Sequence, residues 1–378
     1  MSLVAAIWQS PAHHLKAEAP DHPMLYFSPA VLQATYARFA RGFPGLVTYA
    51  VKANDGRIVL ENLAAAGMRA FDVASPAEMR KVRAVRPDAV LHYNNPVRSR
   101  DEIAAGVAMG VASWSVDSGS ELAKLADQVA PGAEISVRFK LPVKGAAYDF
   151  GAKFGAEPGR AAALLAEAAR LGYAPALTFH PGTQCADPAA WAAYIAGAAA
   201  IARAAGVRIG RLNVGGGFAS HRYGAAPDLD AILGGIEAAV AKAFGAERPA
   251  LVCEPGRAMV AEAVTLGARI KALRDCGAVF LNDGIYGAFA EAPTMGNVDR
   301  IAVVGPGGQL REGPPEPRTV FGPTCDSLDR LPGEVPLPGD AEEGDWILFR
   351  GMGAYSTATV TRFNGYGEIG VTTVHDPL

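Results

Sequence analysis

A lysine stands at the end of a short apolar run near the start of the chain, a place where an amine could do chemistry. Residues 46–51, Leu-Val-Thr-Tyr-Ala-Val, predict a strand, and Lys52 follows them directly. A neutral lysine amine can form a Schiff base with an aldehyde, and burial among apolar neighbours lowers the pKa of lysine toward that neutral form. The ordinary alternative is a lysine that extends from the strand end into water.

Three further motifs hold residue types that suit binding of an aromatic phosphate ester. His180 has apolar residues before it and a glycine two residues after it, a context that suits a ring stacked flat on an aromatic group. The glycine triplet at 215–217 lets backbone N–H groups approach a phosphate without interference from a Cβ atom. Glu254 could bind a protonated pyridine nitrogen and Arg257 a phosphate. Taken singly, these motifs are equally consistent with a core histidine, a plain turn and a surface ion pair.

The elements that must position these residues form a repeated pattern. Short apolar runs alternate with longer helical patterns at 158–171, 188–205 and 229–244, which is typical of βα units. About eight such units close a (β/α)₈ barrel, an α/β fold. The predicted strands are 46–51, 70–73, 89–93, 112–116, 134–139, 176–179, 211–214 and 251–253.

The carboxyl ends of these strands carry most of the polar residues noted above. Barrel enzymes build their active sites from the strand ends, so one cavity should collect an amine, two carboxylates, an imidazole and a glycine loop. In chain order the strand ends hold Lys52, Asp72, Asn94 with Asn95, Asp117, Arg138, His180, the triplet at 215–217 and Glu254.

After Arg257 the helical periodicity fades, and β-like runs separated by loops rich in glycine and proline follow. This change predicts a second, all-β domain. We expect a barrel over 28–257 and a β domain over 258–378 that also takes in 1–27, through the apolar run at 25–27. The segments 305–317 and 332–343 are predicted to be surface loops. Strands of the β domain are predicted at 263–270, 279–281, 300–304, 346–349 and 357–363.

Composition is that of an ordinary enzyme of the cytoplasm. The chain has 378 residues, 50% of them hydrophobic, and a formal net charge of −3. It offers no basic patch for nucleic acid, no apolar stretch near the roughly 18 residues that a membrane span needs, and no signal peptide. Its four cysteines have neither metal-ligand nor disulfide spacing, so we expect packed thiols, a reducing compartment and no metal.

In their order along nearly the whole chain, these motifs resemble those of the pyridoxal-phosphate-dependent decarboxylases with an alanine-racemase-type barrel, the ornithine and diaminopimelate decarboxylase family, with ornithine decarboxylases the most similar. The motifs are Tyr-Ala-Val-Lys-Ala-Asn at 49–54, Phe-Asp-Val-Ala-Ser at 71–75, Lys-Phe-Gly at 153–155, His-Pro-Gly-Thr at 180–183, Gly-Gly-Gly-Phe at 215–218, Glu-Pro-Gly-Arg at 254–257, Asn-Asp-Gly-Ile-Tyr-Gly at 282–287, Gly-Pro-Thr-Cys-Asp-Ser-Leu-Asp at 322–329, Gly-Ala-Tyr at 353–355 and Phe-Asn-Gly at 363–365.

The resemblance implies a role for each matching position. Lys52 would bind the aldehyde of pyridoxal 5'-phosphate, Glu254 its pyridine nitrogen, and His180 one face of its ring, with Asp72 and Arg138 nearby. Cys325 would return a proton to Cα, and Asp326 would pair with a distal ammonium group. The expected phosphate ligands are Thr183, Gly215, Gly216, Gly217, Arg257 and Tyr355, and Gly256 is also expected to bind the cofactor. The expected substrate ligands are Cys325, Asp326, Asp283, Tyr286 and Phe363.

Such enzymes are homodimers in which the partner subunit supplies the cysteine and the aromatic ring, so a homodimer with shared sites is implied. The expected reaction is decarboxylation of L-ornithine to putrescine, a step of polyamine biosynthesis. The stretch 288–295 lacks the second aspartate expected for the distal amine, and Glu291 is a candidate substitute. Lysine, another diamino acid or a siderophore-type conjugate therefore stays open as the substrate. An amino-acid racemase and a non-catalytic regulatory homologue are the alternatives from other classes.

Overall fold

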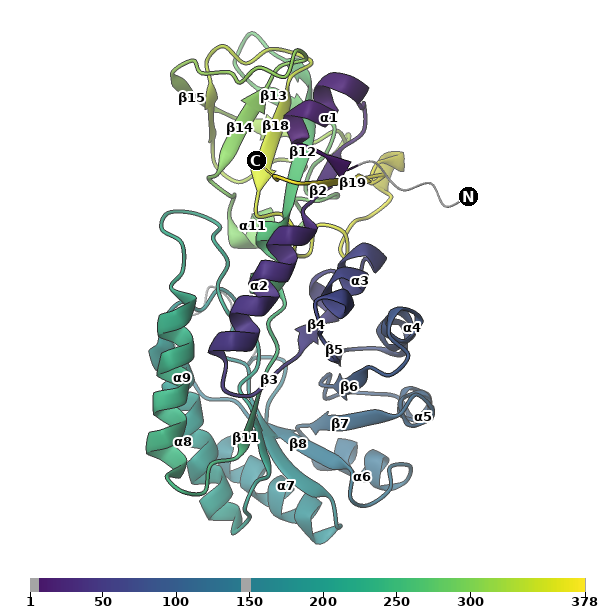
Figure 1. Cartoon of the computed structure of the whole chain (residues 1–378), viewed down its shortest axis with the longest axis vertical. Coiled ribbons are helices and arrows are strands. Elements are labelled where there is room, and N and C mark those ends of the chain that lie inside the picture. The colour runs from purple at the N-terminus through teal and green to yellow at the C-terminus, as the bar shows by residue number, and fades with distance from the viewer. Residues whose placement is uncertain (1–6, 144–150, 378) are drawn as a thin grey trace. The chain divides into compact units, whose positions relative to one another are not determined.

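The chain is described by a computed structural model that covers residues 7–143 and 151–377 (Figure 1). It forms two compact units, each with its own internal packing. The barrel unit comprises Thr35–Ala219 and Pro227–Met259, and the β unit comprises Met1–Ala34, Ser220–Ala226 and Val260–Leu378. The domain boundaries given by the sequence patterns, 28–257 with 1–27 and 258–378, remain a prediction.

The barrel unit is built on one sheet in which every neighbouring pair of strands is parallel. The strand order is β3-β11-β10-β9-β8-β7-β6-β5-β4, so the first and last members of the sheet are consecutive in the chain. The strands are β3 (Leu46–Val47), β4 (Tyr49–Ala50), β5 (Ala70–Val73), β6 (Val90–Tyr93), β7 (Val111–Val116), β8 (Glu134–Arg138), β9 (Ala174–Thr178), β10 (Arg211–Asn213) and β11 (Ala250–Cys253).

The predicted strand at 46–51 is divided at Thr48, and this division closes the barrel. β3 pairs with β11, whereas β4 pairs with β5, so the two halves of one extended segment join opposite edges of the sheet. Thr48 lies between the two short strands. Its backbone N–H and its hydroxyl both donate to the carbonyl of Cys253, the last residue of β11. The strand pattern ends at Ala50, and Val51–Ala53 form a 3₁₀ turn that carries Lys52.

Helices lie outside the strands of the barrel, as Figure 1 shows. Several begin with a serine cap; the hydroxyls of Ser75, Ser99 and Ser118 each accept the N–H of a glutamate three residues later. The predicted helices at 158–171, 188–205 and 229–244 are confirmed. The helices are α2 (Pro29–Gly42), α3 (Arg57–Ala65), α4 (Pro76–Val85), α5 (Arg100–Ala108), α6 (Gly119–Ala126), α7 (Pro158–Arg170), α8 (Pro188–Ala205), α9 (Leu229–Phe244) and α10 (Arg257–Val260).

The β unit contains a mixed sheet whose central strand, β12, pairs with β2, β13 and β18. β2 covers the run at 25–27, so the predicted entry of the N-terminal segment into this unit is confirmed. The elements are β1 (Ile7–Trp8), α1 (Pro11–Glu18), β2 (Met24–Phe27), β12 (Val264–Leu273), β13 (Val279–Leu281), α11 (Ala292–Met295), β14 (Ile301–Val304), β16 (Val320–Phe321), β18 (Trp346–Arg350) and β19 (Gly370–Val374).

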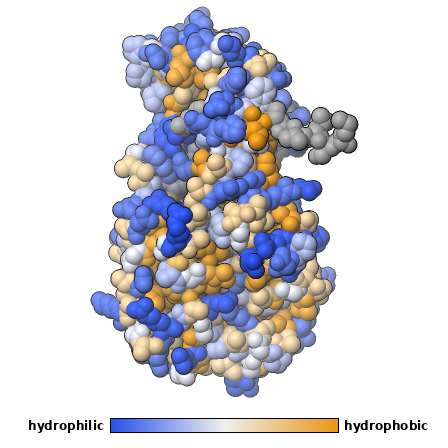
Figure 2. Space-filling model, viewed as in Figure 1, coloured by the Kyte–Doolittle hydropathy of each residue, from blue (hydrophilic) through white to orange (hydrophobic). Residues whose placement is uncertain are grey.

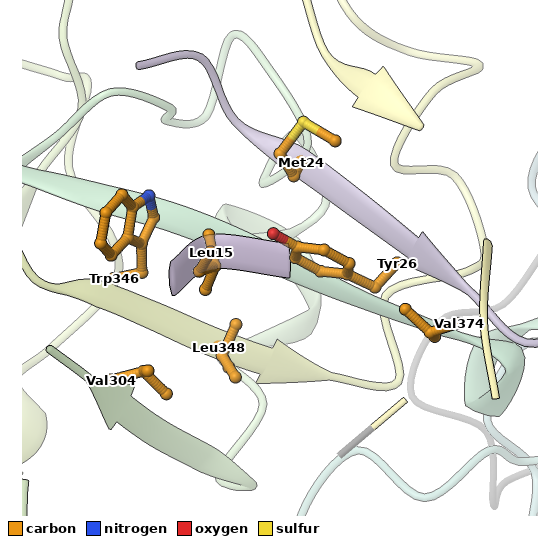
Figure 3. Close-up of a cluster of buried hydrophobic side chains, with 7 residues drawn as sticks. All are labelled: Leu15, Met24, Tyr26, Val304, Trp346, Leu348 and Val374. Atoms are coloured by element: carbon orange, nitrogen blue, oxygen red, sulfur yellow. The ribbon is translucent and has the colours of Figure 1, made fainter. Parts of the chain in front are cut away.

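One hydrophobic cluster ties helix α1 to this sheet (Figure 3). It joins residues from the start of the chain, at 15–26, to residues from its last quarter, at 304–374, so the β unit needs both parts of the chain to complete its core. Burying large side chains contributes roughly 1.5–3 kcal/mol each relative to leaving them exposed. The cluster consists of Leu15, Met24, Tyr26, Val304, Trp346, Leu348 and Val374.

Two predictions for the β unit are wrong. Residues 357–363 form turns and irregular backbone, not a strand, and they lead into a short 3₁₀ turn at Phe363–Gly365. The predicted loops at 305–317 and 332–343 contain β15 (Pro315–Arg318) and β17 (Val335–Pro338), which pair antiparallel. Proline lacks an N–H to donate, and a two-stranded ribbon tolerates it because each strand has one free edge.

On the face seen in Figure 2, polar residues are interspersed with hydrophobic ones. Within residues 7–143 and 151–377, no helix is long and apolar enough to cross a membrane. The same described ranges contain no group of three or more His, Cys, Asp or Glu side chains arranged to hold a metal ion.

Candidate active site

A cavity of about 210 Å³ opens at the carboxyl ends of the barrel strands. It brings together five residues that the sequence predicted from separate strand ends, the outcome expected when parallel strands close into a barrel. Those five are Lys52, Asp72, Arg138, His180 and Glu254, and the remaining lining residues are Ala74, Asn94, Asn95, Lys153, Phe154, Thr178 and Phe179.

Lys52 has an environment that differs from the expected one. Lys52 is exposed and is not buried among apolar neighbours, because it lies in the 3₁₀ turn at Val51–Ala53 and not in the strand. Its positive charge acts on three carboxyl groups, those of Asp72, Glu78 and Glu254, and lowers the pKa of each. The amine therefore stands on the cavity wall close to anionic groups.

Glu254 follows β11 and is the acceptor for two side-chain amides. The Nδ2 atom of Asn94 donates to Glu254 Oε1 over 2.6 Å, and Nδ2 of Asn213 donates to the same oxygen. Burial raises the pKa of Glu254, and Lys52 together with the Asn213 hydrogen bond opposes that rise. Glu254 is thus a buried carboxyl group whose anionic form has dedicated donors.

Asp72, at the end of β5, is a second buried carboxyl group in the same cavity. Burial raises its pKa well above the usual value, and the neighbouring Glu254 raises it further, while Lys52 lowers it. Two buried carboxyl groups this close do not ionise independently, because like charges disfavour each other. Asp72 and Glu254 therefore form a pair in which protonation of one favours ionisation of the other.

His180 presents a neutral ring to the cavity. Burial, with Lys52 and then Arg138 as nearby positive charges, holds its pKa well below 6.5. Its Nδ1 atom accepts the backbone N–H of Gly182 over 3.1 Å, so the proton of the neutral ring is on Nε2. The Gly182 turn has φ of 107°, a conformation that favours glycine. The ring is fixed in orientation and can stack on an aromatic group.

The glycine triplet after β10 lies against the backbone at 179–182 and at Glu254. A Cβ on Gly216 would be 2.6 Å from the Glu254 carbonyl oxygen and 3.3 Å from His180 Nε2. A Cβ on Gly215 or Gly217 would overlap the carbonyl oxygens of Phe179 and Gly182, respectively. Only glycine fits these positions, because a Cβ on each would overlap a neighbouring backbone carbonyl oxygen.

Gly256 and Arg257 continue from the same strand exit as Glu254. A Cβ on Gly256 would lie 3.1 Å from the Cβ atoms of both Ala50 and Ala53, so this glycine lets β11 approach the turn that carries Lys52. Arg257 is buried at the start of α10. Thr183, the remaining predicted phosphate ligand of the barrel unit, is partly buried. Two residues later, the backbone of Cys185 forms an isolated parallel β-bridge with Phe218, which follows the glycine triplet.

In the β unit, Cys325 and Asp326 belong to a surface cluster with Tyr286 and Phe363, in which Cys325 and Phe363 are exposed and Asp326 and Tyr286 are half-buried. The Tyr286 hydroxyl donates to Asp326 Oδ2, and the rings of Tyr286 and Phe363 lie 4.9 Å apart. The backbone N–H of Cys325 donates to Asn364 Oδ1 over 3.0 Å. The hydrogen bond from Tyr286 lowers the pKa of Asp326, so this carboxylate stays anionic near neutral pH. Tyr355, also in the β unit, has φ of 61° at the start of a turn.

Asp283 stabilises its own loop through a backbone hydrogen bond. Its side chain is 3% exposed and accepts the N–H of Ala288 over 3.0 Å. Burial raises its pKa to about 7. This placement favours a structural role over the substrate contact that its motif implied.

Glu291, the candidate substitute for the missing aspartate, lies 4.0 Å from the guanidinium of buried Arg222. Its charge is thus compensated within the β unit. The sequence patterns placed Asn94 at a strand end without giving it a role, and they missed Asn213, although it also stands at a strand end, a position that the barrel pattern marks for function.

Comparisons with known proteins agree with this geometry. Residues 30–261 match the family described as pyridoxal-dependent decarboxylase, pyridoxal binding domain. Ornithine decarboxylase of Panagrellus redivivus is 31% identical, over 92% of this chain and 84% of that protein. This chain belongs to the pyridoxal-dependent decarboxylases.

Solved structures of other decarboxylases share the fold. Arginine decarboxylase of Paramecium bursaria Chlorella virus has a TM-score of 0.85 at 26% identity, over 95% of this chain and 98% of that one. Lysine/ornithine decarboxylase of Vibrio vulnificus, solved with putrescine, has a TM-score of 0.81 at 26% identity, over 95% of this chain and 96% of that one. The expected architecture, a (β/α)₈ barrel with a β domain that takes in the N-terminal segment, is confirmed.

The residues of the cavity fit pyridoxal 5'-phosphate, the cofactor of this decarboxylase family. The cavity offers an amine for the aldehyde, a neutral flat ring and a carboxylate with its own donors. Beside His180 lies a glycine loop that a Cβ would fill. Each chemical group of the cofactor therefore has a matching residue type in the barrel unit.

Proposed function

We propose that this decarboxylase converts a diamino acid to the corresponding diamine and carbon dioxide, with L-ornithine, giving putrescine, as its first candidate substrate. The observation that carries the proposal is the meeting of Lys52, His180 and Glu254 around one cavity of about 210 Å³. The named activities of the relatives support a substrate with a cationic distal group, because ornithine, lysine and arginine all have one. Polyamine biosynthesis is the pathway that such a product would serve.

Each residue of the cavity has a proposed part in holding the cofactor. Lys52 would bind the aldehyde, Glu254 would accept a hydrogen bond from the protonated pyridine nitrogen, and His180 would cover one face of the ring. Bound pyridoxal phosphate draws electrons away from the substrate Cα, which permits loss of the carboxylate. Asp72 and Arg138 would set the charge near the ring, and the phosphate would be held by Thr183, Gly215, Gly216, Gly217, Arg257 and Tyr355, with Gly256 also part of the cofactor site.

The surface cluster of the β unit supplies the proposed substrate contacts. Asp326, kept anionic by the Tyr286 hydroxyl, pairs with the distal ammonium group. The Cys325 thiol is exposed and can return a proton to Cα. Phe363 and Tyr286 place aromatic surface beside both groups.

A homodimer with shared sites is part of the proposal. Leu328 and Phe363 are 72% and 42% exposed on the loops that carry Cys325 and Asn364. Exposed apolar side chains beside proposed substrate-binding residues are typical of a surface that a second copy of the chain covers. The four cysteines are all free thiols, which suits the cytoplasm as the proposed compartment.

Lysine is the second candidate substrate. The stretch at 288–295 offers no aspartate for the distal amine, and Glu291 is already engaged by Arg222. One anion, Asp326, then recognises the ammonium group, and one anion discriminates weakly between side chains that differ by a single methylene.

The test is release of carbon dioxide by the purified holoenzyme from L-ornithine, L-lysine, L-arginine, diaminobutyrate and diaminopimelate. We expect the highest kcat/KM with ornithine, lysine second, and little turnover of diaminopimelate, whose distal carboxylate would meet Asp326. Racemisation without carbon dioxide release would contradict the proposal. A protein that lacks the absorbance of bound cofactor after incubation with pyridoxal phosphate would be a non-catalytic homologue.

A further inference from the structure

Two amides from different strand ends converge on a single oxygen of Glu254. Asn94 follows β6, and Asn213 ends β10; each donates through Nδ2 to Oε1. Glu254 and Asn94 are 7% and 9% exposed, and Asn213 is 4% exposed, so these bonds form away from solvent. Hydrogen bonds to a buried charged group are stronger than those between neutral groups.

The orientation of the Asn213 amide is fixed by a further contact. The Oδ1 atom of Asn213 accepts the N–H of Gly215 over 2.9 Å, which leaves only its Nδ2 for Glu254. Asn94 also lowers the pKa of the Asp72 carboxyl group, and its buried Oδ1 atom has no hydrogen-bond partner among the described residues. The Nδ2 donor of Asn94 is therefore directed at Glu254, in a cavity that Asp72 also lines.

The geometry leaves the second oxygen of Glu254 for another partner. Among residues 7–143 and 151–377, no hydrogen bond to Oε2 is found, and Glu254 lines the cavity with Lys52 and His180. Donors on Oε1 favour the carboxylate over the carboxylic acid, because a protonated acid accepts fewer and weaker hydrogen bonds.

We propose that Asn94 and Asn213 are positioning residues that hold Glu254 as the anionic member of the Asp72–Glu254 pair, with Oε2 presented to the pyridine nitrogen of the cofactor. This inference rests on the proposed function, since it assigns Glu254 to that nitrogen. It goes further by stating that the protonation of the ring nitrogen is set by two neutral amides that do not touch the cofactor nitrogen.

The experiment compares two ligands for the cofactor-free protein: pyridoxal phosphate, and its analogue in which a carbon replaces the ring nitrogen. The quantity measured is the ratio of their dissociation constants, obtained by titration and read by absorbance or fluorescence, so no turnover is needed. In the parent protein the ratio should favour pyridoxal phosphate. Asn94→Leu keeps the approximate shape of the side chain and removes the donor, and it should reduce the ratio by about tenfold or more.

Asn95→Ala is the matched control. Asn95 lines the same cavity, but its Nδ2 donates to the Ala74 carbonyl and its Oδ1 accepts the Val97 N–H, so it does not touch Glu254. Its substitution should leave the ratio unchanged, whatever it does to both affinities together. If Asn94→Leu does not fold, Asn94→Ala carries the same expectation.

An equal loss of affinity for both ligands in the Asn94 variant would overturn the inference and make Asn94 merely structural, while the proposed function would stand. An unchanged ratio would overturn it as well. Failure of the parent protein to bind pyridoxal phosphate at all would instead reject the proposed function, and the two failures are therefore distinct.

Discussion

At the residue scale, the cavity is organised by charge. Lys52 stands among carboxyl groups, Glu254 receives two amide donors, and His180 is held neutral. Burial is the largest cause of the pKa shifts of Asp72, His180 and Glu254, and the charge of Lys52 acts on all three groups.

The first prediction concerns Lys52. Lys52→Ala should remove both turnover and the absorbance band of covalently bound cofactor, because an amine is required to bind the aldehyde. Lys153→Ala is the control, since Lys153 is another amine on the cavity wall, 5.0 Å from the Phe154 ring. It should keep the band. Persistence of the band in Lys52→Ala, with loss in Lys153→Ala, would reassign the aldehyde to Lys153.

The second prediction concerns substrate recognition by Asp326. Asp326→Asn should lower kcat/KM for ornithine by roughly 30-fold, because it removes the charge that faces the distal ammonium. The kcat/KM for norvaline, a neutral amino acid of similar length, should fall only slightly, and the absorbance spectrum of the cofactor should not change.

Glu291→Gln is the control for Asp326, because Glu291 is paired with Arg222 and should not alter the preference for ornithine over norvaline. If Asp326→Asn depressed both substrates equally, or if Glu291→Gln changed the preference, recognition of the ammonium group would have to be assigned elsewhere.

At the element scale, the loops of the β unit are shaped by buried carboxyl groups. The Asp329 carboxylate accepts the backbone N–H groups of Ile285 and Thr324 and the Thr324 hydroxyl. It thereby ties the loop before Cys325 to the loop of Tyr286. Asp283 does the same within its own loop through Ala288. The loops that carry Cys325, Asp326 and Tyr286 are thus held in place by hydrogen bonds to buried carboxyl groups.

The third prediction is a pH dependence that arises from Asp283. Burial raises its pKa from 3.8 to about 7, although the N–H groups of Ala288 and Gly284 oppose the rise. Because the folded pKa is the higher one, the stabilising contribution of the protonated group is complete below the unfolded value and is lost as the pH rises through about 7. Asp283→Asn stays neutral and should flatten this dependence by roughly 1 kcal/mol per pH unit between those values.

Denaturant unfolding of the cofactor-free protein at several pH values measures this effect. Asp230→Asn is the control: Asp230 is an exposed partner of Arg38, with 72% of its side chain accessible, and should leave the slope as in the parent. Equal slopes for Asp283→Asn and the parent would mean that Asp283 is ionised in the folded protein throughout this range.

At the scale of the whole molecule, the proposed chemistry is divided between two compact units. The barrel unit holds the residues suited to the cofactor, and the β unit holds Cys325, Asp326 and the aromatic pair Tyr286–Phe363. The exposed Leu328 and Phe363 give the β unit a surface suited to a second copy of the chain. A dimer with sites shared between subunits follows from the proposal.

The fourth prediction tests the shared site. Lys52→Ala and Cys325→Ala chains are each expected to be inactive, but mixing them through a dissociation and reassociation step should restore about a quarter of the parent activity. Half of the dimers would be hybrids, and each hybrid would contain one intact site. Mass-resolved detection of the hybrid is the control. Hybrids without activity would place Cys325 in the site of its own subunit or make it structural.

The sequence by itself determined the barrel, the strand ends and the chemical types that meet there. Lys52, His180 and Glu254 could be assigned to one cavity because parallel strands bring their carboxyl ends together whatever their separation in the chain. The predicted helices at 188–205 and 229–244 match α8 and α9, because long periodic patterns are the strongest local signal.

Only the tertiary structure decided which groups become partners. The division of 46–51 at Thr48 depends on which strands lie on either side, and the amides that reach Glu254 come from residues 160 and 41 positions away. The paired strands β15 and β17 lie in segments whose prolines and glycines predict loops. Local composition reports the preferences of a residue, but charge compensation and hydrogen bonding are settled by neighbours that the fold brings in from elsewhere in the chain.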